Sequence, residues 1–128
     1  MSILKIYQGQ ILQAALSEIV SPVHINYAAV DQPEPDLLAA LTDLQALVSD
    51  MAVEITPEAA LEADQLTVRG EHGPKLIFIG APLGTELAAL VSAVIVAGRG
   101  QSGLTPETKK ILAGLSAAAH LQVFTTPT

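Results

Sequence analysis

Three histidines are the side chains of this sequence best suited to bind a metal ion. His24, His72 and His120 are evenly spaced along the chain, and a metal site would require them to converge with a carboxylate. His24 and His120 lie in segments that alternate like β-strands, whereas His72 lies in a turn beside a Gly-Pro pair. We therefore expect histidines at the surface or at strand edges, and no metal site.

Acidic residues and glycine-rich loops suggest chemistry that their surroundings do not support. Glu54, Glu58 and Glu62 recur every fourth residue and could supply a general acid and base, but a solvated acidic surface is the better interpretation. The glycines of 80–84 and 98–103 lack both the Lys-Ser/Thr of a phosphate-binding loop and a full Gly-x-Gly-x-x-Gly pattern. We interpret both segments as turns and helix caps.

No catalytic nucleophile stands out in the sequence. Ser17, Ser92 and Ser116 lie in predicted helices, without the strained strand-to-helix turn that exposes a hydrolase serine. Cysteine is absent from all 128 residues, which excludes thiolate catalysis, thiolate metal ligands and disulfides. We expect no catalytic residue, no cofactor and no metal site in this chain.

The composition is that of a small, acidic, globular protein. Half of the 128 residues are apolar, which is enough for one core, but the chain is too short for two domains of ordinary size. A net charge of -7 with six scattered basic residues disfavours nucleic acid and anionic membranes as partners. The longest apolar run, 87–98, falls short of the roughly 20 residues of a membrane span, and no signal peptide is visible. We predict a cytoplasmic protein.

Hydrophobic periodicity divides the chain into alternating helices and strands. The prolines and the capping residues set the expected boundaries, with Asp36 as one N-cap and Thr56-Pro57-Glu58 as the start of another helix. Ile77 and Ile79 should pack against Leu87, Leu90, Val91 and Val94 in the core. The expected elements are helices over 3–20, 36–50, 58–63, 85–97 and 105–119, with strands over 23–30, 51–56, 66–70, 75–79 and 120–126.

The element order contains one unit and the beginning of a second. After the first helix, it is the order of a thioredoxin-like unit, in which helices cover both faces of a four-stranded mixed sheet. Residues 11–17 and 111–116 are weakly similar, and each precedes a strand-like segment, as two copies of a repeat would. We predict an α/β, thioredoxin-like unit over 1–100. Residues 101–128 should be a linker, a helix and a strand that begin a second unit.

A Gly-x-Pro-x-Gly-x-Glu pattern, formed by Gly80, Pro82, Gly84 and Glu86, follows the hairpin and enters the next helix. Within residues 75–98 it resembles a segment of the tandem thioredoxin-fold disulfide oxidoreductases. These include the archaeal and bacterial protein disulfide oxidoreductases and the N-terminal domain of the alkyl hydroperoxide reductase flavoprotein. The resemblance implies that the four residues are structural. It also implies a first unit that often lacks cysteines and serves as a structural or docking half.

The ending of the chain carries the second part of this resemblance. Residues 123–128 are similar to the strand and turn that, in this family, run directly into the redox Cys-x-x-Cys of the second unit. Thr126, Pro127 and Thr128 would then be the lead-in to that motif. Because the chain stops at this point, we expect a truncation at the redox residue. One hypothesis is selenocysteine, whose UGA codon is read as a stop by a host that lacks the recoding machinery.

Two departures from the family pattern bear on activity. The loop 28–36 occupies the place of a Cys-x-x-Cys motif, yet it contains no thiol, so no nucleophile can sit there. Working thioredoxin units also place a cis-proline before the third strand, whereas residues 63–66 contain no proline. The resemblance therefore implies a catalytically silent unit with an altered substrate-binding edge.

The sequence leads to one functional hypothesis and one alternative. The first is the non-catalytic N-terminal half of a disulfide oxidoreductase, whose partner is a protein or the second thioredoxin-like unit. The alternative is a complete, cysteine-free module that holds a protein partner through a sheet edge or the loop 28–36. A homodimer through the C-terminal strand is a further expectation, because an unpaired strand needs a partner.

Overall fold

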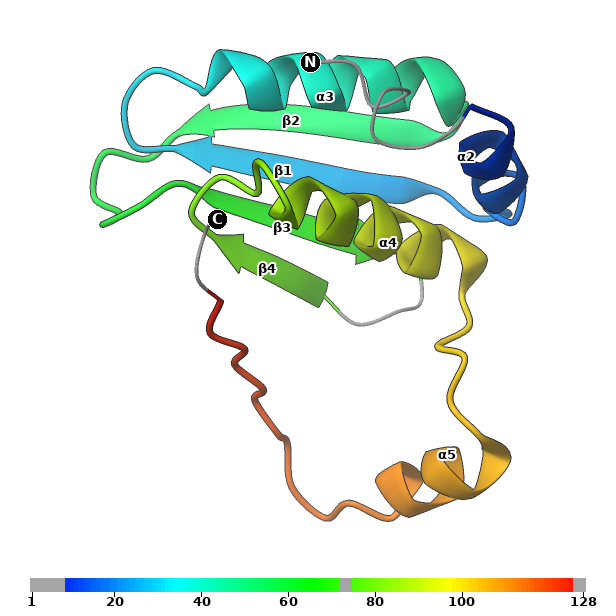
Figure 1. Ribbon diagram of the computed structural model, residues 1–128. Coiled ribbons are helices and arrows are strands. Elements are labelled where there is room, and N and C mark those ends of the chain that lie inside the picture. The colour runs from blue at the N-terminus through cyan, green and yellow to red at the C-terminus, as the bar shows by residue number, and fades with distance from the viewer. Residues whose placement is uncertain (1–8, 72–74, 126–128) are drawn as a thin grey trace.

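The computed structural model describes residues 9–71 and 75–125 (Figure 1). Its elements follow the expected alternation of helices and strands over most of the chain. They are α2 (Gly9–Leu16), β1 (Val23–Ala29), α3 (Pro35–Leu47), β2 (Met51–Pro57), β3 (Gln65–Gly70), β4 (Lys75–Ile79), α4 (Glu86–Arg99) and α5 (Pro106–Ala113). No helix in this described part is long and apolar enough to cross a membrane.

The four strands form one mixed sheet in the order β2-β1-β3-β4. β1 and β2 are parallel because α3 returns the chain between them, as a parallel pair requires. β3 is antiparallel both to β1 and to β4, and β3 and β4 form the expected hairpin. This arrangement confirms the predicted α/β class and the four-stranded mixed sheet.

One face of the sheet carries the core. Strand residues alternate between the two faces, so Val23, Ile25 and Tyr27 of β1 lie on one side, beside Leu66 and Val68 of β3. These five side chains are buried, together with the apolar faces of α3 and α4 and with Leu12 and Leu16 of α2. The α3 and α4 residues in this core are Leu37, Ala40, Leu41, Leu44, Leu87, Leu90, Val91, Ala93, Val94 and Ala97.

The second face of the sheet is open to solvent. His24, Glu54 and Arg69 point to this side and are exposed, and no helix of the described residues covers them. The helix expected over 58–63 does not form. Among the described residues, α2, α3 and α4 all pack on the core face, so the expected helices on both faces of the sheet are not found. The predicted helix start, Thr56-Pro57-Glu58, joins the sheet instead. β2 continues to Pro57, and the Glu58 N–H donates to the Ala29 carbonyl at 2.9 Å. The residues left before β3 are too few to nucleate a stable helix.

The expected core partners in the hairpin were wrong by one residue. Pairing with β3 places Leu76 and Phe78 on the core side, and Phe78 packs against the core. Ile77 and Ile79 therefore lie on the open side and are 46% and 70% exposed. The helix half of the prediction is correct, because Leu87, Leu90, Val91 and Val94 are all buried.

Several helix ends also differ from expectation, and α2 and α3 stop at Leu16 and Leu47 instead of at 20 and 50. α3 begins one residue earlier than its predicted cap, with Glu34 as N-cap and Pro35 in the first turn, because proline fits this position without losing a hydrogen bond. α4 runs past Gly98 to Arg99, and Gly100 ends it in the left-handed conformation at φ 72°.

The C-terminal segment 101–125 leaves the sheet after α4, and beyond α5 it returns to the amino end of α4 (Figure 1). Thr105, where the last helix was expected to begin, caps α5, since its Oγ1 accepts the Thr108 N–H at 3.2 Å. However, α5 ends at Ala113, well before 119, and residues 114–125 contain no strand. A strand-like pattern has no ladder hydrogen bonds unless a sheet neighbour lies beside it, and this segment is exposed along its whole length.

Candidate functional site

Tyr27 and Asp64 form a buried hydrogen-bonded pair at the carboxyl end of β1. The Tyr27 side chain is fully buried, and its hydroxyl donates to Asp64 Oδ2 at 2.6 Å. The same hydroxyl oxygen accepts the Glu34 N–H at 3.0 Å, just before α3 begins. Tyr27 therefore links β1, the loop that follows it and the residue that precedes β3.

Asp64 extends this network to two further segments. Its Oδ1 accepts the Val30 N–H at 2.9 Å, and its backbone carbonyl accepts the Gly80 N–H at 2.6 Å. The first contact fixes the start of the loop 30–34, and the second fixes the turn after β4. One residue thus joins the end of β1 to the beginning of β3 and the end of β4.

The electrostatics of this network favour structure over catalysis. Burial raises the pKa of Tyr27 to about 12, and the hydrogen bond to Asp64 acts in the same direction. The phenol therefore stays neutral throughout the physiological range, and its hydroxyl donates a hydrogen bond to Asp64. A general acid or base would need a pKa near the working pH. With Glu34 and Asp36 flanking it, the beginning of α3 is also unfavourable for an anionic nucleophile.

The four residues of the Gly-x-Pro-x-Gly-x-Glu pattern shape the turn between β4 and α4. Gly80 and Gly84 have φ of 90° and 61°, a backbone region that residues other than glycine rarely adopt. Pro82 lies between them and is buried. Glu86 lies in the first turn of α4, and its Oε1 accepts the Thr125 hydroxyl at 2.6 Å. The expected lead-in, Thr126, Pro127 and Thr128, lies outside the described residues.

The other candidate residues remain apart. His24 is exposed on the open face, His120 is exposed in the C-terminal segment, and His72 lies outside the described residues. Within 9–71 and 75–125, no three His, Asp or Glu side chains gather as metal ligands. The three glutamates at 54, 58 and 62 are exposed, and so are the serines at 17, 92 and 116.

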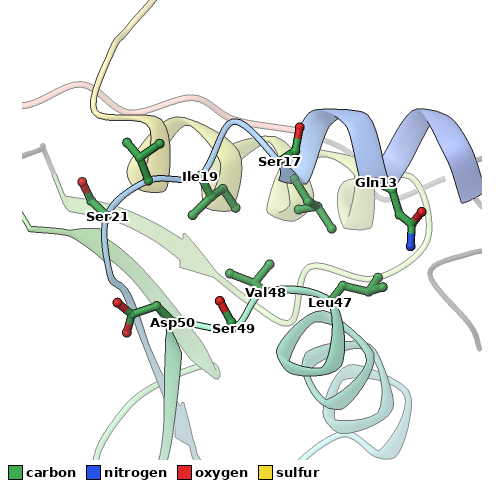
Figure 2. Close-up of a pocket in the computed structure, with 10 residues that line it drawn as sticks. Gln13, Ser17, Ile19, Ser21, Leu47, Val48, Ser49 and Asp50 are labelled. Atoms are coloured by element: carbon green, nitrogen blue, oxygen red, sulfur yellow. The ribbon is translucent and has the colours of Figure 1, made fainter.

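Two cavities lie away from the Tyr27 network. One of about 540 Å³ lies between α2 and the turn from α3 to β2, at the amino ends of β1 and β2. Figure 2 shows Gln13 and Ser17 on one side of it and Leu47 to Asp50 on the other. The second, of about 390 Å³, lies on the open face of the sheet and is lined by His24, Asn26, Glu54, Thr67, Arg69 and Lys75, among others.

The sequence did not reveal the Tyr27–Asp64 pair. Part of its signal was present, because Asp64 lies within residues 63–66, the segment in which the family resemblance leads one to expect a cis-proline. Tyr27 is the aromatic residue that ends the buried alternation of the first strand. An acid in one place and a phenol in the other suggest a hydrogen bond only when the two strands are known to be neighbours.

Comparison with known proteins shows a similarity at the level of structure. No protein-family model matches the sequence, and no curated protein matches it significantly. The chain is similar to the structure of the alkylhydroperoxide reductase component AhpF from Enterococcus faecalis V583, C503A mutant, with a TM-score of 0.68 and 20% identity. The match covers 84% of this chain and 59% of that one.

The fold is thioredoxin-like. The comparison supports the expected relation to AhpF at the level of architecture, since 20% identity carries the fold alone. In this thioredoxin-like fold, the loop 30–34 lies between the first strand and the following helix. It is the place where the resemblance puts a dithiol, and here it holds hydrogen bonds to Asp64 and Tyr27.

Proposed function

We propose that this chain is a cysteine-free, thioredoxin-like unit that serves as the structural or docking half of a disulfide oxidoreductase. It has no thiol exchange of its own. The fold supports the relation to redox proteins of this kind, and the absence of cysteine from the chain supports the silent role.

The observation that carries the proposal is the Tyr27–Asp64–Val30 network. A working dithiol needs a helix N-terminus that lowers the pKa of its thiol, and it needs room for a substrate beside it. In this chain the Asp64 carboxylate takes the Val30 N–H and the Tyr27 hydroxyl, so the loop is tied to the neighbouring strand. The loop to which the resemblance assigns a dithiol is here held to the neighbouring strands by hydrogen bonds to Asp64 and Tyr27.

An insulin-reduction assay tests the silent role. With dithiothreitol as reductant, the chain should not raise the rate of insulin reduction above the uncatalysed rate, because it has no thiol to exchange. A thioredoxin-like protein with a Cys-x-x-Cys motif serves as the positive control. Turnover that grows with the concentration of the cysteine-free chain would overturn the proposal.

The source DNA tests the relation to a larger oxidoreductase. An in-frame second thioredoxin-like unit after the Thr128 codon would support the proposal, whether its redox motif begins with a cysteine codon or with UGA. A UGA codon followed by an in-frame Pro-x-Cys-like stretch would support selenocysteine in particular. A UAA or UAG codon with no downstream reading frame would contradict the larger protein.

The open face of the sheet favours a second candidate function. A complete interaction module would need an accessible surface, and the face around Arg69, Lys75 and Ile77 is exposed and hollowed. The same DNA reading separates the two candidates. A stop codon without a second unit would leave the interaction module as the better description of the chain.

A further inference from the structure

Among residues 9–71 and 75–125, no strand pairs with the outer edge of β4. β4 is the last strand of the sheet, and three of its five side chains are large, apolar and exposed: Leu76 at 37%, Ile77 at 46% and Ile79 at 70%. Natural sheet edges usually carry charges, a proline or a bulge that prevents pairing with another strand. β4 has no proline, and its single charged residue is Lys75, at one end.

The chain's own C-terminal segment is poorly placed to cover this edge. The hydrogen bond from Thr125 to Glu86 brings that segment to the amino end of α4, beside the carboxyl end of β4. A strand over 120–125 would therefore run parallel to β4, with α4 as the crossover between them.

The handedness of such a crossover decides against it. β1 and β4 point in the same direction, since each is antiparallel to β3. Both α3 and α4 lie on the core face, but β2 lies to one side of β1 and the added strand would lie to the opposite side of β4. The two crossovers would have opposite hands. Nearly all parallel crossovers share the same, right-handed sense. Because the sheet already contains the crossover from β1 through α3 to β2, a crossover of the opposite hand from β4 through α4 is disfavoured.

We propose that β4 pairs antiparallel with β4 of a second copy of this chain, about a two-fold axis at Ile77. This proposal is independent of the proposed function. In this register Ile77 faces Ile77 of the second copy on the open face, and Leu76 faces its Phe78 on the core face. Each exposed apolar side chain near the axis gains an apolar neighbour, and the two sheets become one of eight strands.

The side-chain pattern of β4 is suited to pairing with a second copy of the same strand. Both of its faces are apolar, whereas an ordinary solvated edge is polar on at least one face. Because the pairing is antiparallel, the two Lys75 residues lie at opposite ends, about 14 Å apart at ~3.4 Å per residue. That distance exceeds the Debye length of about 8 Å at physiological salt, so the two ammonium groups do not oppose pairing.

Disulfide trapping gives the sharpest test, because the chain contains no cysteine. Cross-strand partners in an antiparallel pair have Cα atoms about 4.5 or 5.5 Å apart, within the range of a disulfide. I77C should therefore form a covalent dimer rapidly under mild oxidation. I79C is the matched control, because its two copies would lie about 14 Å apart, beyond the reach of a disulfide.

The control is demanding because Ile79 is the more exposed residue. Random collision would crosslink I79C at least as fast as I77C, and that result would overturn the proposal. Faster trapping of L121C than of I77C would also overturn it, since it would point to association through the C-terminal segment.

Analytical ultracentrifugation tests the proposal without a thiol. The unmodified chain should show a concentration-dependent dimer, and higher salt should strengthen it because each copy carries a net charge of -7. I77K should weaken association by about tenfold or more, since two ammonium groups would then meet at the axis. I111K, on exposed α5, should leave association unchanged. A strict monomer at about 1 mM, the weak end of specific association, would refute the pairing.

Discussion

Replacing Asp64 with alanine is the perturbation that best measures how firmly the loop 30–34 is held. The change removes the carboxylate that accepts the Tyr27 hydroxyl at 2.6 Å and the Val30 N–H at 2.9 Å. Hydrogen bonds to charged groups contribute about 1.5–3 kcal/mol each, which gives an upper sum of about 3–6 kcal/mol. Asp64 is only half-buried, so water can replace part of its role. We expect D64A to lower the free energy of unfolding by about 2–4 kcal/mol.

Urea denaturation followed by circular dichroism measures this effect, with Asp31→Ala as the matched control. Asp31 lies in the same loop but is exposed, so its removal should cost less than about 0.5 kcal/mol. A double-mutant cycle with Tyr27→Phe should give a coupling energy of about 1–2 kcal/mol, because the two residues share one hydrogen bond. Equal costs for D64A and D31A would refute the assigned role of the network.

Two further predictions concern the core and the dependence on pH. Leu90→Ala should cost about 2–5 kcal/mol in chemical denaturation, because Leu90 is fully buried between α4 and the sheet, and a cost below about 0.5 kcal/mol would contradict this packing. The raised pKa of Tyr27 stabilises the fold fully below pH 10 and loses that contribution as pH rises through about 12. The difference in stability between the wild type and Tyr27→Phe should therefore shrink over this range, and a difference independent of pH would count against a buried, hydrogen-bonded phenol.

The sequence was sufficient for most of the sheet. Alternation in Val23–Ala29 identified β1, because burial on one face leaves a period of two. The turn residues 71–74 between two strand-like runs identified the β3–β4 hairpin. The sequence did not identify the buried face of β4, since Leu76, Ile77, Phe78 and Ile79 are all apolar. Only the register with β3 selects Leu76 and Phe78 as the core side.

Helix ends and long-range contacts were harder to predict. The pattern Thr56-Pro57-Glu58 is typical of a helix start, but pairing of Ala29 with Pro57 in the parallel ladder extends the strand over it. Likewise, Tyr27 and Asp64 are 37 residues apart, and their contact depends on which strands are neighbours. Local preference gives way wherever a tertiary partner supplies more hydrogen bonds than the local motif does.

The open second face of the sheet has a thermodynamic consequence. The heat capacity change of unfolding and the denaturant m-value both scale with the surface that unfolding exposes. Residues 101–125 are exposed in the native state, and strand residues such as His24, Glu54 and Arg69 already contact water. Unfolding therefore hydrates less new surface than it would in a three-layer domain of 128 residues. The stability curve of this protein should be correspondingly flat, with a shallow maximum and a gradual response to temperature and to urea.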